Sequence, residues 1–365
     1  MVIAEERERL LELPRQALAR ARRDPSTWAE FAFRPESARN GAARYGLVLA
    51  LQYDRRAADL ALLRFVLRQQ IAWCRERALG YFPTILFQAG LLVAEHRRVE
   101  DVWLHWEAKE LSFDTALGYR DHLLLTPGVT TVRDAVARAS EPARDRLLDH
   151  LTRSRWTDTD VDVWLAEQRL SFPEDPAAED LKRWSHHASA LGDPEASRRF
   201  LIAWADGEPR TVDTLNTVQF HLAEQGFFTE AIAAQREVVT LAEPDDRSFR
   251  LCVLAELQRK AADPEGAWHS LQTAAAELPA GRAHTLPGLW CQVARECFLI
   301  APLVPAERTR AAFDLGEEVL RGGPAWWMNG AADAALAAAE RLGDVGLVAR
   351  AREMRRIADE QRATG

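Results

Sequence analysis

The chain lacks most of the short motifs by which enzymes and metal-binding proteins are recognised. Its four cysteines form no C-x-x-C pair and have no histidine at zinc-site spacing, so we interpret them as buried, reduced thiols. No phosphate-binding loop, G-x-S-x-G sequence, Rossmann glycine pattern or EF-hand loop is present. We therefore predict no catalytic residue of those classes and no cofactor.

Long apolar runs and a recognisable leader are missing as well. No stretch of about 18 uncharged apolar residues could span a bilayer. The first residues, Met1–Leu10, carry acidic side chains and lack the apolar core of a signal peptide. We expect a cytoplasmic protein that does not bind membranes.

Lysine is nearly absent, since only three of the 47 basic residues are lysines. Such a preference for arginine is typical of a GC-rich genome, and we expect a bacterial one. We therefore do not interpret the arginines as recognition groups. The net charge is −8, and arginine alternates with glutamate in residues 5–9, as on a solvated helix face. Both observations argue against nucleic-acid binding.

The residues that are present favour a folded helical protein. Hydrophobic residues make up 47% of the 365 positions and charged residues 28%. Apolar residues recur at helical spacing, and no segment keeps the strict alternation of a strand. We predict an all-α protein without a β-sheet. The prolines in 171–177 indicate a boundary between an irregular N-terminal region, 1–170, and more regular helical hairpins in 178–365, although one continuous array is the alternative.

The most regular stretch is Leu215–Pro279, which has the pattern of two successive helical hairpins. The second hairpin repeats the apolar and small positions of the first 36 residues later, so that Ala231 and Ala267 occupy corresponding points. A hairpin of this kind cannot bury its apolar faces alone. It needs neighbours stacked against it.

These hairpins resemble the tetratricopeptide repeat, whose pattern is W-x2-L-G-x2-Y, then A-x3-F, then P over about 34 residues. Glutamine departs from that pattern at three positions, Gln219, Gln235 and Gln258. The resemblance implies a right-handed α-solenoid of antiparallel helical hairpins whose concave groove binds a protein or peptide, and it implies no catalytic residue. The matching positions are Leu215, Val218, Leu222, Gly226, Phe228, Ala231 and Pro244 in the first copy, and Leu251, Leu254, Ala255, Ala267, Leu271 and Pro279 in the second.

The favoured hypothesis for function is a non-enzymatic scaffold that binds a protein or peptide in this groove. Gln219, His221 and Gln258 lie on the first helices of the central hairpins and are candidate contacts. Trp326 and Trp327 are adjacent, so both cannot face one core, and one could be a binding anchor. The alternative that we favour is that one of them fills the groove to the previous hairpin while the other covers the turn.

Two other hypotheses stay open. The first is a helical enzyme or metal-binding protein with a site near His96, Asp101 and His105, because a carboxylate and a histidine one helical turn apart could bind zinc or exchange a proton. We favour a solvated ion-pair stripe of Asp101, His105 and Lys109, since no H-E-x-x-H motif is present and no third ligand is assured. The second is a regulator that senses a peptide.

The adjacent histidines His186 and His187 are a weaker candidate for a metal site. Neighbouring residues on a helix point about 100° apart, so the two rings cannot easily converge on one ion. We predict a structural role for this segment.

Overall fold

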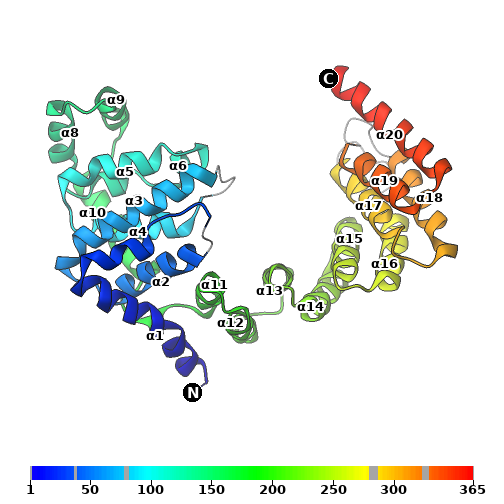
Figure 1. The fold of residues 1–365 in the computed structure, drawn as a ribbon, viewed down its shortest axis with the longest axis horizontal. Helices are drawn as coiled ribbons and strands as arrows, with labels where there is room; N and C mark the ends of the chain where they lie inside the picture. Colours follow the sequence, from blue (N-terminus) through cyan, green and yellow to red (C-terminus); the bar gives the residue numbers. More distant parts are fainter. Residues whose placement is uncertain (1, 37–38, 78–81, 279–286, 323–328, 365) are drawn as a thin grey trace. The chain divides into compact units, whose positions relative to one another are not determined.

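The computed structural model describes residues 2–36, 39–77, 82–278, 287–322 and 329–364 (Figure 1). In these ranges every regular element is a helix and no strand occurs, which confirms the predicted all-α class. No helix within them is both long enough and apolar enough to cross a membrane. The chain folds as two compact units, Met1–Trp204 and Ala205–Gly365, which are described separately below.

The first unit contains short and long helices in an irregular arrangement. Its elements are α1 (Val2–Arg23), η1 (Pro25–Phe31), α2 (Arg39–Tyr53), η2 (Ala57–Asp59), α3 (Leu60–Arg77), α4 (Thr84–Ala94), η3 (Val99–Asp101), α5 (Val102–Lys109), α6 (Phe113–Gly118), α7 (His122–Leu125), α8 (Val129–Arg138), α9 (Arg144–Arg153), α10 (Asp158–Ser171), η4 (Pro176–Ala178), α11 (Leu181–Ala190) and α12 (Pro194–Gly207). The last residues of α12 belong to the second unit.

Helix α4 is the centre of the first unit. Every residue from Leu86 to Ala94 is buried, and α2, α3 and α7 all pack against this helix. A helix that is apolar on all sides is stable only when other elements surround it. Gly90 leaves room for Tyr119, the residue that follows α6, because a Cβ atom at position 90 would overlap the hydroxyl group of this buried side chain.

The predicted boundary segment, 171–177, lies inside the first compact unit. Hydrogen bonds tie it to α2 and to the residues just after this helix. The Gln52 amide donates to the Pro173 carbonyl oxygen at 3.0 Å, and Arg55 donates to the Phe172 carbonyl oxygen. The division between the two units falls between Trp204 and Ala205 instead.

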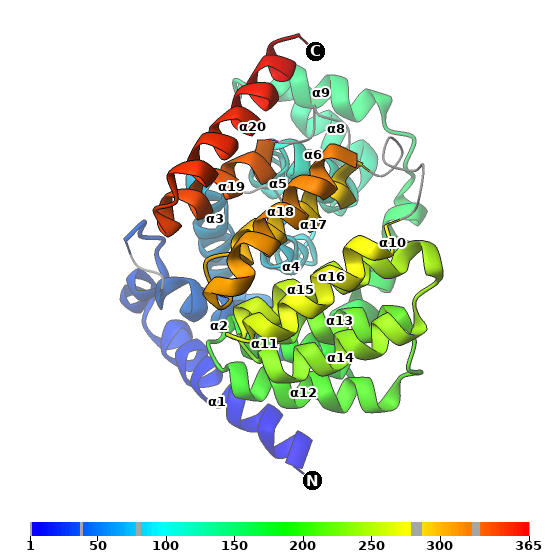
Figure 2. The ribbon, with the colours of Figure 1, turned by 90° about the vertical axis from the view of Figure 1, so that its right-hand side faces the viewer.

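The second unit is a succession of packed helix pairs (Figure 2). Ala231 and Ala267, the small residues that correspond in the sequence pattern, are both fully buried. Gly226 has a φ of 84° in the turn before α14, a conformation that glycine adopts without strain. The helices are α13 (Val212–Glu224), α14 (Phe228–Leu241), α15 (Pro244–Lys260), α16 (Pro264–Ala276), α17 (Pro287–Ile300), α18 (Ala306–Gly322), α19 (Asn329–Leu342) and α20 (Val345–Thr364).

Gly90→Ala tests the packing around α4. The added methyl group would displace the Tyr119 ring, so we expect the free energy of unfolding to fall by about 1–3 kcal/mol. Gly41→Ala in α2 is the matched control, because a Cβ atom there meets nothing within 4 Å. Helix propensity alone should make that control more stable by about 0.5–1 kcal/mol. Urea unfolding followed by circular dichroism measures both, and equal effects of the two substitutions would contradict the packing argument.

Candidate functional site

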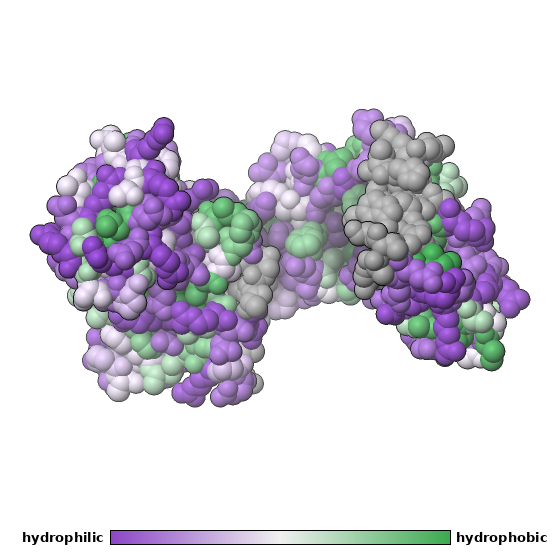
Figure 3. Space-filling view, turned by 90° about the horizontal axis from the view of Figure 1, so that it is seen from above, coloured by the Kyte–Doolittle hydropathy of each residue, from purple (hydrophilic) through white to green (hydrophobic). Residues whose placement is uncertain are grey.

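Exposed apolar side chains are dispersed over the molecule. Large examples among the described residues are Phe113 in α6, Leu170 in α10 and Val345 in α20, at 77%, 84% and 83% exposed. The face drawn in Figure 3 is mostly hydrophilic, with small hydrophobic areas between the charged side chains. Single exposed apolar residues are normal on protein surfaces and do not define a site.

A cavity of about 750 Å³ in the first unit is the better candidate. It lies between α2, α3, the beginning of α4 and α11, and its volume falls within the range of pockets for small molecules. Aromatic rings and cationic or amide side chains dominate the wall. The rings belong to Phe33, Tyr45, Trp73 and Phe172, the cations to Arg44, Arg77, Lys182 and Arg183, and the amides to Gln70 and Gln88.

Arg44 is the most unusual residue of this wall. Its side chain is only 2% exposed, and its Nε and Nη1 atoms have no hydrogen-bond partner among the described residues. The guanidinium Cζ lies 5.6 Å from the centre of the Phe33 ring. Burial lowers the pKa of Arg44, and the charge of Arg77 lowers it further. A charge that is removed from water without a counter-ion typically costs several kcal/mol of stability. An acceptor supplied by a ligand would reduce this cost at Arg44.

The other charges of the wall do not compensate Arg44. Asp180 is the single acidic side chain among the described residues that line the cavity. Its carboxylate accepts the backbone N–H of Arg183 at 2.8 Å and thereby caps α11. Arg183 donates to the Ser171 carbonyl oxygen at 2.6 Å and lies over the Phe172 ring. The excess positive charge of the wall is therefore carried by Arg44, Arg77 and Lys182.

Two further groups of the wall can bind a polar ligand. Gln70 lines the cavity and is 3% exposed. Pro83, Thr84 and Ile85 bring the beginning of α4 to the cavity. This helix has no side-chain cap at Pro83 and no acidic residue in its first turn. The first amides of a helix lack intrahelical acceptors and carry the positive end of the helix dipole, so they favour an anion.

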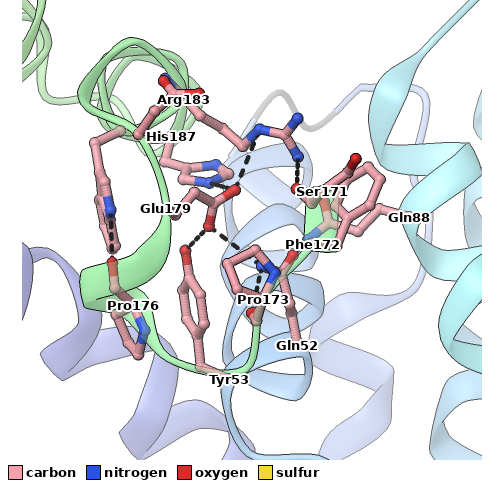
Figure 4. Close-up of polar contacts among 12 residues, drawn as sticks. Gln52, Tyr53, Gln88, Ser171, Phe172, Pro173, Pro176, Glu179, Arg183 and His187 are labelled. Carbon is pink, nitrogen blue, oxygen red and sulfur yellow. Dashed lines mark hydrogen bonds and ion pairs between the residues drawn. The ribbon is translucent and has the colours of Figure 1, made fainter. Parts of the chain in front are cut away.

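Glu179 fastens the α11 side of the cavity (Figure 4). Its carboxylate is 4% exposed and accepts hydrogen bonds from the Tyr53 hydroxyl and, at 3.2 Å, from the Gln52 amide. His187 Nε2 and Arg183 Nε lie 3.3 Å from Oε1. Burial alone would raise the pKa of Glu179, but the interactions with His187, Tyr53 and Arg183 hold it below its usual value. The charged carboxylate thus joins α2 to α11.

His187 continues this network to the cavity. The hydroxyl of Tyr45 lies 2.8 Å from His187 Nδ1. The other ring nitrogen, Nε2, is the one that lies toward Glu179. Burial, together with the charge of Glu179, raises the pKa of Tyr45, so the phenol is neutral at physiological pH. The chain Tyr45–His187–Glu179 orients the tyrosine hydroxyl at the wall of the cavity.

The residues predicted as a solvated stripe are buried, so that interpretation is wrong. Asp101, His105 and Lys109 are only 5%, 2% and 8% exposed. The reason is that α3, α6 and α7 enclose α5, so its polar side faces other helices and not solvent.

Each residue of the stripe has a partner of its own within the first unit. Arg64 Nε donates to Asp101 at 2.5 Å, the Tyr119 hydroxyl lies 2.7 Å from His105 Nδ1, and Lys109 lies 3.0 Å from Asp121. Burial lowers the pKa of His105 to about 3, which keeps the ring neutral. The half-buried His96 also has a pKa lowered by burial. Among the described residues no group of three possible metal ligands occurs.

The candidate partner contacts of the second unit lie in different environments. Gln258 is 4% exposed and hydrogen-bonds to Ser270 at 2.7 Å, so its amide joins α15 to α16 and is not available to a partner. Gln219 and His221 are partly buried on α13, and His221 Nδ1 is 3.6 Å from Glu224. Trp326 and Trp327 lie outside the described residues.

In the first unit, His187 is buried while His186 is exposed, as expected for neighbours on a helix.

The Arg44 site itself was not predicted, because arginine is so abundant in this sequence that no single arginine is distinguished. The sequence does contain a signal, which is a charged residue on the apolar side of a helix: Arg44 lies one helical turn before Val48 in the apolar α2.

Comparison of the chain with protein-family models, curated proteins and solved structures finds no match.

Glu179→Gln tests the anchor of α11. Loss of the charge should lower the free energy of unfolding at neutral pH by about 1–3 kcal/mol, because the buried partners lose a charged acceptor. A folded-state pKa below the usual 4.5 means that this contribution is present above pH 4.5 and disappears as the pH falls below it. The difference between the wild type and the variant should therefore shrink as the pH is lowered.

Glu174→Gln is the matched control, since the Glu174 side chain is 69% exposed and lies 3.9 Å from Arg55. That control should change the unfolding free energy by less than about 0.5 kcal/mol at any pH. Urea unfolding at several pH values measures the unfolding free energy of the wild type and both variants. A difference for Glu179→Gln that does not vary with pH would rule out the charged anchor.

Proposed function

We propose that this chain is a non-enzymatic helical binding protein whose first unit takes an anionic ligand into the cavity beside Arg44. The observation that carries the proposal is a guanidinium group, 2% exposed, whose Nε and Nη1 atoms have no partner among the described residues. Other buried charges of the same unit, such as Asp101 and Lys109, have oppositely charged partners.

A bound anion would relieve the cost of burying Arg44. Hydrogen bonds between a guanidinium and an anionic oxygen are about twice as strong as those between neutral groups. They also gain strength where burial lowers the local dielectric constant, as it does around Arg44. Arg77 and the beginning of α4 add to the positive potential there, and the uncapped helix end supplies amide donors.

In this proposal the second unit is a tetratricopeptide-like α-solenoid that binds a protein or peptide partner. The packed helix pairs α13–α14 and α15–α16 support it, and so does the burial of Ala231 and Ala267. Small residues at these positions let the two helices of a pair approach closely. A chain with a ligand cavity in one unit and a partner surface in the other can act as a regulator.

Arg44→Met tests the anion site. Methionine fills part of the same volume without a charge, so in chloride buffer the variant should be more stable than the wild type by about 1–3 kcal/mol. Phosphate at equal ionic strength should stabilise the wild type, by about 2.7 kcal/mol when its concentration is 100-fold above the dissociation constant. The variant should show no such gain. Thermal unfolding in the two buffers measures both effects.

Arg75→Met is the matched control on α3. Arg75 is 59% exposed and pairs with Glu107 at 2.8 Å, so its loss should change stability by less than about 0.5 kcal/mol and leave the phosphate effect intact. The proposal fails if phosphate stabilises the wild type and Arg44→Met equally, or if it stabilises neither.

A further inference from the structure

The chemistry of the anion can be inferred from the two arginines of the cavity. Arg44 and Arg77 both line it, and the charge of Arg77 acts on Arg44. Asp180, the acidic residue among the described members of the wall, is engaged at the cap of α11. A carboxylate ligand would neutralise only one of the two guanidinium charges. A phosphomonoester carries a charge of about −1.5 to −2 at neutral pH and would match both.

The beginning of α4 agrees with a phosphate group. Thr84 and Ile85 line the cavity within the first turn of an eleven-residue helix, and the residue before them provides no side-chain cap. Backbone amides and the helix dipole together form a common binding site for phosphate oxygens. This feature acts with the buried and unpartnered Arg44, which lies in the same wall.

The remaining wall suits a planar ring. Phe33 and Trp73 present aromatic groups, and each has an arginine over its face, Arg44 at 5.6 Å and Arg77 at 5.7 Å. Guanidinium planes and aromatic faces both stack on flat ligands. The amide of Gln70 can donate and accept hydrogen bonds at the edge of such a ring. Inorganic phosphate alone would leave most of the 750 Å³ unfilled.

We propose that the ligand is a small phosphomonoester joined to a planar ring system, with its phosphate between Arg44, Arg77 and the beginning of α4, and its ring beside Trp73. This inference rests on the proposed anion-binding function. It commits to a free small molecule, because the cavity has the volume of a small-molecule site.

Isothermal titration calorimetry on the full chain tests the ligand class with four probes: inorganic phosphate, phenyl phosphate, adenosine monophosphate and benzoate. At least one of the two ring-bearing phosphates should bind at least about tenfold more tightly than inorganic phosphate, and benzoate should bind more weakly than either of them. That result is expected because only these two probes supply both the dianion and the ring.

Two variants test where the phosphate and the ring of the ligand bind. Arg77→Met, at an exposed side chain, should weaken binding of the ring-bearing phosphates at least about tenfold and leave the affinity for benzoate within about twofold. Trp73→Leu should weaken the ring-bearing phosphates and leave inorganic phosphate within about twofold. Circular dichroism melts without ligand show whether each variant is folded.

The outcomes separate the two proposals. If benzoate binds more tightly than the ring-bearing phosphates, or if these phosphates bind no better than inorganic phosphate, the inferred ligand class is overturned while the anion site stands. If no anion binds, and Arg44→Met behaves like the wild type toward all four probes, the proposed function itself is refuted.

Discussion

Glu179 makes the contacts on which the shape of the first unit depends. Its buried carboxylate accepts hydrogen bonds from Tyr53 and Gln52 of α2, and it lies 3.3 Å from Arg183 and His187 of α11. Without this acceptor the Tyr53 hydroxyl would lose its hydrogen bond, and a partly buried donor that is left unsatisfied costs more than the net gain of one hydrogen bond. The position of α11 relative to α2, and with it one wall of the cavity, depends on the requirement that this buried charge have hydrogen-bond donors and basic side chains around it.

The same requirement distinguishes Arg44 from the other charges of this unit. Asp101 is paired with Arg64, Lys109 is paired with Asp121, and Glu179 has several donors. These interactions hold helices that are too short to be stable by themselves, because a helix of eight residues such as α5 depends on tertiary contacts. Arg44 contributes no comparable pair within the described residues. Its charge therefore cannot be explained as part of the scaffold, and a role toward a ligand is the explanation consistent with its place in the cavity wall.

The sequence was sufficient to predict an all-α protein and the corresponding positions of Ala231 and Ala267, because helical periodicity and small residues are local signals. It was not sufficient to predict which polar side chains are buried. Asp101, His105 and Lys109 share a stripe whether solvent or another helix lies opposite, and periodicity does not distinguish the two cases. Gln258 likewise matches a position of the repeat, but only the structure shows that its amide is bonded to Ser270. Burial of a polar side chain depends on residues distant in the chain, such as Tyr119 for His105.

In the proposed function, a buried charge that has no partner among the described residues also links the stability of the first unit to ligand binding. A compound that binds only the folded state stabilises it in proportion to the logarithm of its concentration. If an anion binds here as proposed, part of that gain would be relief of the cost of burying Arg44. An apolar residue at position 44 would remove the cost permanently, so selection for stability alone would not favour arginine there. Residues that reduce stability in this way are concentrated at functional sites. The wall that contains Arg44 also contains Tyr45, and Tyr45 is hydrogen-bonded to His187 of α11. Occupancy of the cavity would therefore act on the two helices that Glu179 joins.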